Sequence, residues 1–183
     1  MQRIKIGVMG ASGGELPAEE KSRLEALAEQ LGAAIAGRGC VLVTGATTGL
    51  PDMVSRSARK HGGLTVGISP AETMEEHERL GLPADGVEVI LYTGFGFKGR
   101  NVVNIRSCDI VIIFGGATGT LNEFTIAYDE GKVIGVLEGS GGIADHIKEI
   151  LAFCHKPTRA RLVYESAPKK LLDACLEIFQ RTR

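Results

Sequence analysis

The sequence has little proline, few cysteines and almost no net charge. Its 183 residues include 6 Pro and 4 Cys, and 21 Lys and Arg are balanced by 22 Asp and Glu, which leaves a formal net charge of −1. A nucleic-acid-binding surface needs clustered Lys and Arg and a high isoelectric point, so we expect no nucleic-acid partner. No apolar stretch approaches the roughly 18 residues of a transmembrane helix, so we expect no membrane association.

The cysteines and histidines form no metal-binding motif. Cys40, Cys108, Cys154 and Cys175 are widely spaced, and only Cys154 has a neighbouring histidine, on a residue pair poorly placed to chelate one ion. Three of the four lie in apolar runs, which is typical of buried thiols in a reducing cytoplasm. We therefore expect a cytoplasmic protein with no metal and no cofactor, and its scattered histidines at the surface or at helix caps.

Two nucleotide-binding motifs are also absent. The glycines after the first apolar run do not match G-x-G-x-x-G, and no acidic residue follows the second predicted strand to hold a ribose. The pattern G-x-x-x-x-G-K-[ST] is missing as well, which disfavours an ordinary NTPase. The first apolar run, residues 4–9, is too short for the core of a signal peptide and is expected to form a strand.

Glycine is the residue type in excess. The 25 glycines are about 14% of the chain, roughly twice the average usage. They follow no G-x-y period, and 44% of the residues are hydrophobic, so neither a collagen nor a disordered linker fits. The length indicates a single domain, residues 1–183.

Short apolar runs alternate with amphipathic helical patterns. Strands are expected at residues 4–9, 40–44, 64–68, 87–91, 109–114, 133–136 and 161–164. Helices are expected at residues 19–38, 51–61, 98–107, 120–130, 142–153 and 168–181. This alternation predicts a Rossmann-like, doubly wound α/β fold with about seven mostly parallel strands flanked by helices. The polar, Glu-rich segment 70–86 is expected to be a solvated loop, with a lid as the alternative.

Most of the glycines follow predicted strands. They are Gly10, Gly13, Gly14, Gly45, Gly49, Gly94, Gly96, Gly99, Gly115, Gly116, Gly119, Gly139, Gly141 and Gly142. In an open α/β sheet these loops all emerge at the carboxyl edge, where ligands bind. Glycine lets the backbone approach a ligand closely, and the helix N-termini behind the loops favour phosphate. Tight-turn geometry alone is the simpler explanation for any one of these loops.

The segment GGATGTLNE, residues 115–123, carries a family resemblance. It resembles the PGGxGTxxE motif of the LOG ("lonely guy") family, which has been mislabelled as lysine decarboxylases. TGATTGL at 44–50 is similar to that family's GGGxxGLM segment, and GVMGAS at 7–12 and GLTVGISP at 63–70 resemble its first and third strands. Arg100 and Asp109 lie where the family has a catalytic arginine and an acidic residue at the start of the next strand.

The resemblance implies an enzyme that cleaves the N-glycosidic bond of a nucleoside 5′-monophosphate to a base and ribose 5-phosphate. It implies catalytic roles for Arg100 and Glu123 and a homodimer or higher homo-oligomer. The residues expected to bind phosphate or nucleotide are Gly10, Ser12, Gly45, Thr47, Gly115, Gly116, Thr118, Gly119 and Thr120. No lysine lies in an evident pyridoxal-phosphate context, so we do not expect a lysine decarboxylase.

Each of these residues also has a simpler interpretation. Glu123 can form a capping box with Thr120, and Arg100 can be a solvated residue at a helix start. Asp109 can orient Arg100 or make a structural hydrogen bond. Ser12, Thr47 and the threonines of the glycine motif are residue types common in turns and N-caps.

The sequence also departs from the family pattern. Gly115 replaces the proline of the motif, Ala117 its second glycine, and Asn101 the lysine that follows the arginine. These departures resemble the divergent branch that includes the molybdenum cofactor carrier protein. A non-catalytic carrier or sensor of a phosphorylated ligand, such as a pterin-type cofactor, is therefore the alternative function.

Overall fold

Strands form where apolar residues follow one another without a break. The computed structural model describes residues 2–13 and 18–182, so Gly14 lies outside the described residues. Every residue of the fifth and sixth strands is buried, as expected for central strands of a parallel sheet. The strands are β1 (Lys5–Gly10), β2 (Val41–Thr44), β3 (Leu64–Ser69), β4 (Val89–Tyr92), β5 (Ile110–Phe114), β6 (Val133–Leu137) and β7 (Arg161–Glu165).

The seven strands form one sheet in the order β4-β3-β2-β1-β5-β6-β7. All six strand pairs are parallel, which confirms the predicted Rossmann-like α/β fold. The chain builds outward from β1 to β4, crosses back to place β5 beside β1, and then builds outward the other way. The strand order therefore reverses between β1 and β5, and in such sheets ligands bind outside the carboxyl ends of the strands at this reversal.

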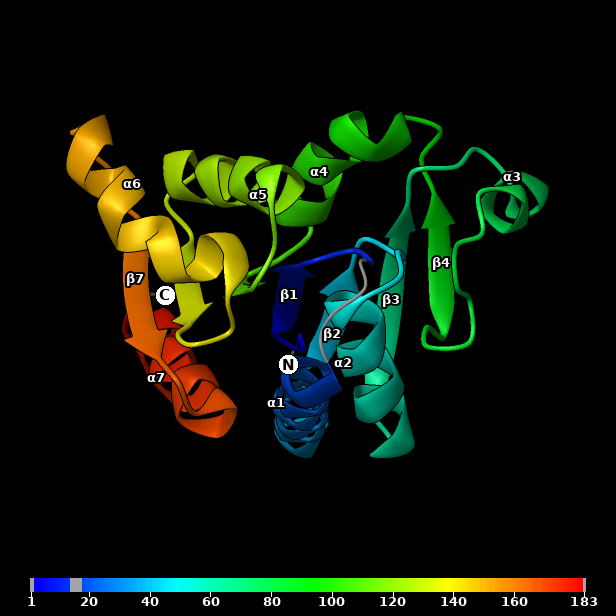
Figure 1. The fold of residues 1–183 in the computed structure, drawn as a ribbon, viewed down its shortest axis with the longest axis horizontal. Helices are drawn as coiled ribbons and strands as arrows, with labels where there is room; N and C mark the ends of the chain where they lie inside the picture. Colours follow the sequence, from blue (N-terminus) through cyan, green and yellow to red (C-terminus); the bar gives the residue numbers. More distant parts are fainter. Residues whose placement is uncertain (1, 14–17, 183) are drawn as a thin grey trace.

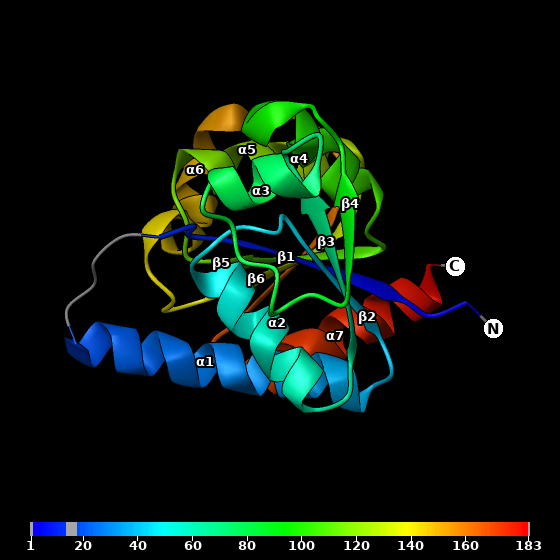
Figure 2. The same ribbon diagram turned by 90° about the vertical axis from the view of Figure 1, so that its right-hand side faces the viewer.

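Helices cover both faces of the sheet (Figures 1 and 2). One face carries α1 (Ala18–Gly37), α2 (Leu50–Lys60) and α7 (Pro168–Arg181). The other carries α4 (Gly96–Arg106), α5 (Thr118–Asp129) and α6 (Ile147–Cys154), the last preceded by the 3-10 helix Gly142–His146. Alternate side chains of β5 enter the two cores: Ile112 packs in the α1, α2 and α7 layer, and Ile113 in the α4, α5 and α6 layer.

The segment 70–86 is not the simple solvated loop that we expected, because it contains the short helix α3 (Met74–Arg79). The Thr73 side chain accepts a hydrogen bond from the Glu76 amide at 3.2 Å, and the Glu76 carboxylate accepts one from the Glu72 amide at 2.7 Å. These bonds satisfy amides at the helix start. A buried side chain of α3 anchors the segment to the rest of the protein.

That anchor is His77, and the expectation of a surface or capping position is wrong for this histidine. His77 is fully buried, with Nδ1 2.9 Å from the Ser69 hydroxyl and Nε2 3.3 Å from the Pro83 carbonyl oxygen. The imidazole thus joins the end of β3 to the far end of the segment 70–86. The other three histidines, His61, His146 and His155, are exposed.

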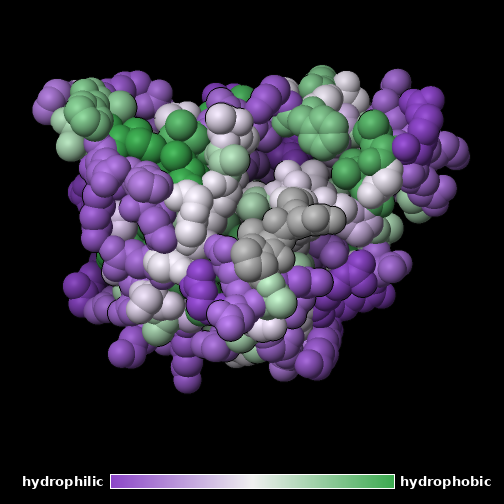
Figure 3. All heavy atoms as spheres, viewed as in Figure 1, coloured by the Kyte–Doolittle hydropathy of each residue, from purple (hydrophilic) through white to green (hydrophobic). Residues whose placement is uncertain are grey.

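The surface view separates apolar from polar regions. In Figure 3 hydrophobic residues gather on both sides of the upper part of the molecule, and the lower part is mostly hydrophilic. No helix in the described part of the chain is both long and apolar enough to cross a membrane. Among residues 2–13 and 18–182, no three His, Cys, Asp or Glu side chains are grouped so that they could hold a metal ion.

Candidate functional site

A pocket of about 350 Å³ opens at the carboxyl edge of the sheet, where the strand order reverses. Its walls come from the loops after β1 and β2, the first turn of α4 and the first turns of α5. The lining residues are Val8, Met9, Gly10, Ala11, Ser12, Gly13, Gly45, Thr47, Pro51, Phe97, Lys98, Arg100, Asn101, Ala117, Thr118, Gly119, Thr120 and Glu123.

Most of the residues singled out in the sequence line this pocket. They are Gly10, Ser12, Gly45, Thr47, Arg100, Thr118, Gly119, Thr120 and Glu123. Gly115 and Gly116 do not line it. The Gly115 amide donates to the Ser140 hydroxyl at 2.9 Å, and the Gly116 carbonyl oxygen accepts from the Ile143 amide at 2.8 Å. These two glycines hold the turn between β5 and α5 against the 3-10 helix.

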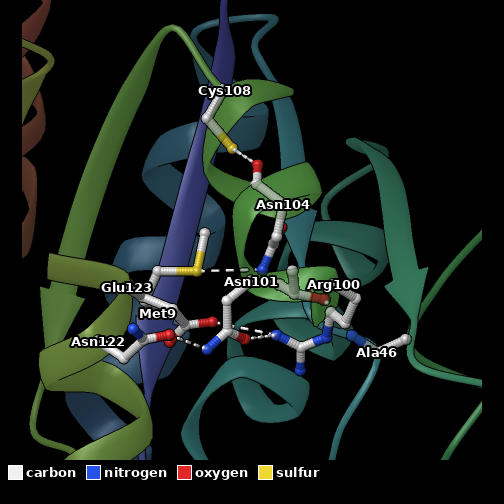
Figure 4. Close-up of polar contacts among 9 residues, drawn as sticks. Met9, Ala46, Arg100, Asn101, Asn104, Cys108, Asn122 and Glu123 are labelled. Carbon is white, nitrogen blue, oxygen red and sulfur yellow. Dashed lines mark hydrogen bonds and ion pairs between the residues drawn. The ribbon is translucent and has the colours of Figure 1, made fainter. Parts of the chain in front are cut away.

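Arg100 and Glu123 form a buried ion pair beside the pocket (Figure 4). Arg100 is only 5% exposed and Glu123 only 7%. The Arg100 Nη1 group donates to Glu123 Oε1 at 3.1 Å, and it also donates to Asn101 Oδ1 at 2.7 Å. The interpretation of Arg100 as a solvated helix-start residue is therefore wrong, because α4 directs this side chain inward toward α5.

Glycine at position 45 makes room for the guanidinium. A Cβ atom at Gly45 would lie 2.2 Å from Arg100 Nη2 and 2.4 Å from Cζ, so the guanidinium packs directly on this backbone. The Arg100 Nε atom is buried and has no hydrogen-bond partner among the described residues. A buried N–H donor of a charged group lowers the stability of the protein unless a ligand or a water molecule accepts its hydrogen bond.

Burial and charge oppose each other in this pair. Burial raises the pKa of Glu123 above the ordinary value of 4.5, against the lowering influence of Arg100. Burial likewise lowers the pKa of Arg100, against the raising influence of Glu123, although a guanidinium remains protonated in proteins. Arg100 is thus the strongest influence that lowers the pKa of Glu123, at a position where water is largely excluded.

A short polar network fixes the geometry of the pair (Figure 4). Asn101 accepts from Arg100 through Oδ1, and its Nδ2 donates to Asn122 Oδ1 at 2.8 Å. Asn104 is fully buried one turn later and donates to Met9 Sδ at 3.2 Å. Asn101, Asn122 and Asn104 therefore tie α4 to α5 and β1 around the ion pair.

The N-terminus of α5 faces the pocket without an acidic residue or a side-chain cap. The helix begins at Thr118, with Ala117 as its N-cap and no side-chain cap hydrogen bond. Thr120 is already the third helical residue, so Thr120 and Glu123 do not form the capping box considered above. The first amides of a helix lack intrahelical partners and carry partial positive charge, which suits an anion.

Asp109 makes structural contacts with Lys5, and it does not orient Arg100. Its carboxylate lies 2.8 Å from Lys5 Nζ and accepts the Lys5 backbone amide at 2.9 Å. These contacts join the starts of β1 and β5. Asp109 is therefore bound at the amino edge of the sheet and does not orient Arg100.

Sequence reasoning missed several lining residues, including Phe97 and Lys98. Both belong to the first turn of α4, which begins at Gly96, two residues earlier than predicted. A signal was present in the sequence, because two closely spaced glycines, Gly94 and Gly96, indicate a turn before the helix. In the structure both glycines have positive φ angles, 66° and 63°.

Comparison with known proteins assigns this chain to a family. The profile of the SLOG cluster4 family matches residues 3–172, almost the whole chain. The chain belongs to the SLOG cluster4 family. This LOG-like assignment confirms the resemblance inferred from the glycine motif.

Three similar proteins show the range of relatives of this SLOG cluster4 protein. A cytokinin riboside 5′-monophosphate phosphoribohydrolase of Mycobacterium marinum is 37% identical over 81% of this chain and 83% of its own. An uncharacterised protein of Archaeoglobus fulgidus is 35% identical over 75% of this chain and 82% of its own. The solved structure of the molybdenum cofactor binding protein of Rippkaea orientalis matches with a TM-score of 0.76 and 29% identity, covering 97% of this chain and 98% of its own.

Proposed function

We propose that this protein binds a nucleoside 5′-monophosphate in the pocket and hydrolyses its N-glycosidic bond, giving free base and ribose 5-phosphate. The observation that carries the proposal is the buried Arg100–Glu123 pair lying beside an uncapped helix N-terminus in one pocket. The phosphoribohydrolase of M. marinum is a relative that supports the same reaction class.

In this proposal the phosphate binds to the first amides of α5. Thr118 and Thr120 add hydroxyl donors, and Arg100, which lines the same pocket, adds positive charge. Backbone amides supply most of the binding, because they point out of the helix end and are fixed before the ligand arrives. This places the sugar over Glu123, about one helical turn further along α5.

The Glu123 carboxylate then acts on the sugar. As the bond between C1′ and the base nitrogen breaks, its electron pair leaves with the base and positive charge develops on the sugar ring. A carboxylate in a site of low polarity stabilises that charge strongly. A water molecule adds its oxygen to C1′, and its proton goes to the departing base nitrogen, so the products are neutral base and ribose 5-phosphate.

The experiment is incubation of the protein with AMP and other nucleoside monophosphates, with chromatographic detection of free base. Glu123→Gln is expected to lower base release by about 100-fold or more while binding of ribose 5-phosphate persists. Gln keeps an oxygen acceptor for Arg100 but removes the negative charge, so the buried guanidinium loses its counter-ion and circular dichroism is needed to check that the variant is folded. Asp129→Asn, an exposed change on the same helix, is the matched control and keeps full activity.

A non-catalytic carrier of a phosphorylated ligand, such as the molybdenum cofactor, is the second candidate. The similarity to the R. orientalis protein across almost the full length favours it, as do Gly115, Ala117 and Asn101 at positions where the LOG motif differs. The same incubation separates the two candidates. Tight binding of a nucleoside monophosphate or a pterin phosphate with no base released by the wild type supports the carrier.

We also propose that the chain acts in the cytoplasm as a homodimer or higher homo-oligomer. Its cysteines are free in the described structure, which fits a reducing compartment. Phe153 on α6 is 83% exposed, and hydrophobic residues gather on the upper part of the surface, which is the composition of an association surface (Figure 3). Sedimentation equilibrium over a range of concentrations gives the assembly size.

A further inference from the structure

An exposed aromatic ring stands at the rim of an otherwise polar pocket. Phe97 is 49% exposed and lines the pocket, and it is the sole aromatic residue among the lining residues that the structure describes. A large apolar side chain left half open to water loses the hydrophobic stabilisation that it gains when something covers it. Because this ring lines the pocket, a ligand bound there can cover the exposed part of the ring.

Two glycines with positive φ angles position Phe97 at the rim of the pocket. Gly94 and Gly96 have φ angles of 66° and 63°, in the left-handed region, on either side of the N-cap residue Phe95. The two glycines let the chain turn from β4 into α4 so that the first helical turn begins above the carboxyl edge of the sheet (Figure 1). Arg100 follows one turn later on the same helix, so Phe97 and the buried arginine face one pocket.

Lys98 adds charge at the same rim. It lines the pocket, is exposed, and forms no ion pair with any residue of the described ranges. Its positive charge lies close enough to help lower the pKa of Glu123. The α4 side of the pocket thus offers a flat apolar ring and a cation, whereas the α5 side offers helix amides and the hydroxyls of Thr118 and Thr120.

A ligand that satisfies both sides carries an anionic group and a planar ring. Sugar phosphates have the first and lack the second, so they leave Phe97 uncovered. A nucleotide or a pterin phosphate has both, and stacking of a heterocyclic ring on an aromatic side chain tolerates many ring types because each has a π face.

We propose that Phe97 is a specificity-determining residue that stacks on the heteroaromatic ring of the ligand, so that the pocket selects ring-bearing phosphates over plain sugar phosphates. The proposal rests on the phosphate-binding role given to this pocket under Proposed function. It applies equally to a substrate base and to a carried pterin, because the same ring chemistry recognises both.

The test compares two probes by isothermal titration calorimetry. Formycin 5′-monophosphate is an analogue of a purine nucleotide whose ring is joined to the sugar through carbon, so it has no N-glycosidic bond to hydrolyse. Ribose 5-phosphate is the same phosphate without the ring. Phe97→Ala is expected to weaken binding of formycin monophosphate by about tenfold and to leave the Kd for ribose 5-phosphate within about twofold. Phe97→Tyr is expected to restore the nucleotide affinity.

Phe153→Ala is the matched control, because it removes another exposed phenylalanine, one outside the pocket, and it is expected to bind both probes as the wild type does. Equal nucleotide affinity in Phe97→Ala and wild type overturns the role of Phe97 while leaving the proposed function intact. An equal loss for both probes also overturns it. If the wild type binds neither probe, the proposed function and this inference both fail.

Discussion

At the residue scale, the position of Arg100 depends on the absence of a side chain at Gly45. The backbone of Gly45 is not in the left-handed region, so alanine is conformationally allowed there, and the conflict is steric alone. The added methyl group would lie 2.2 Å from Nη2, at the flexible end of the arginine. We expect Gly45→Ala to fold and to displace the guanidinium, lowering base release by about 100-fold, measured as kcat/KM on AMP.

Gly37→Ala is the control for this substitution, because a Cβ atom at Gly37 meets nothing within 4 Å. It is expected to retain wild-type kcat/KM. Wild-type activity in Gly45→Ala would show that the guanidinium position is irrelevant to the reaction and would remove Arg100 from the mechanism.

The ionisation of Glu123 gives a pH dependence with a defined sign. Its pKa is raised above 4.5 by burial, and only the ionised form stabilises a positive sugar ring. Acidification through the raised pKa therefore protonates the carboxylate, and kcat/KM falls at a pH above 4.5. The measurement is a pH profile of base release, accompanied by the affinity for ribose 5-phosphate over the same range.

The affinity series separates titration of the protein from titration of the ligand phosphate, whose second pKa is about 6. A fall in kcat/KM that only parallels the affinity belongs to the phosphate. A rate that stays constant down to pH 4.5 would contradict the role of Glu123 as the charge-stabilising carboxylate.

At the element scale, one local pattern occurs twice with two outcomes. The chain has T-x-x-E at Thr73–Glu76 and again at Thr120–Glu123. The first caps α3, whereas in the second the helix has already begun at Thr118 and the glutamate turns inward to Arg100. The T-x-x-E pattern alone does not reveal which glutamate forms an ion pair with an arginine on another helix.

Valine substitutions distinguish the two threonines, since valine keeps the branched shape and removes only the hydroxyl. Thr73→Val removes the cap of α3 and is expected to lower the free energy of unfolding by about 1 kcal/mol. Thr120→Val is expected to change stability by less than about 0.5 kcal/mol and to weaken binding of ribose 5-phosphate. Denaturant unfolding and calorimetry measure the two quantities, and a cap-sized loss of stability in Thr120→Val would contradict this assignment.

Other elements were predictable to different degrees. The continuous apolar run at 110–114 predicted β5 correctly because a strand buried on both faces needs no polar alternation. The helix α3 was missed because the Glu-rich composition of 70–86 outweighed the Thr73 cap. Burial of His77 could not be predicted locally, since its partners Ser69 and Pro83 meet it only through the return of the chain.

At the scale of the whole molecule, the site exists because the sheet reverses its strand order. Residues from the loop after β1, from the loop after β2 and from α5 are more than 100 positions apart at the extremes, and the parallel sheet brings them to one edge. The alternation of strands and helices in the sequence predicted that these loops lie at one edge of the sheet. The inward direction of the Arg100 side chain was not predictable, because it depends on the packing of its guanidinium on the Gly45 backbone.

The packing of the helices on the sheet also buries three of the four thiols, so the reactivity of the thiols tests the fold of the whole molecule. Cys40, Cys108 and Cys175 are buried, and burial raises the pKa of Cys108 and of Cys175 to about 12. Cys154 is exposed at the end of α6. Because the thiolate is the reactive form, a disulfide reagent such as dithiobis(nitrobenzoate) is expected to modify one thiol quickly at pH 8 and all four after denaturation. Cys154→Ser is expected to leave no fast phase, and a second fast-reacting thiol in the native protein would contradict the burial of Cys40, Cys108 or Cys175.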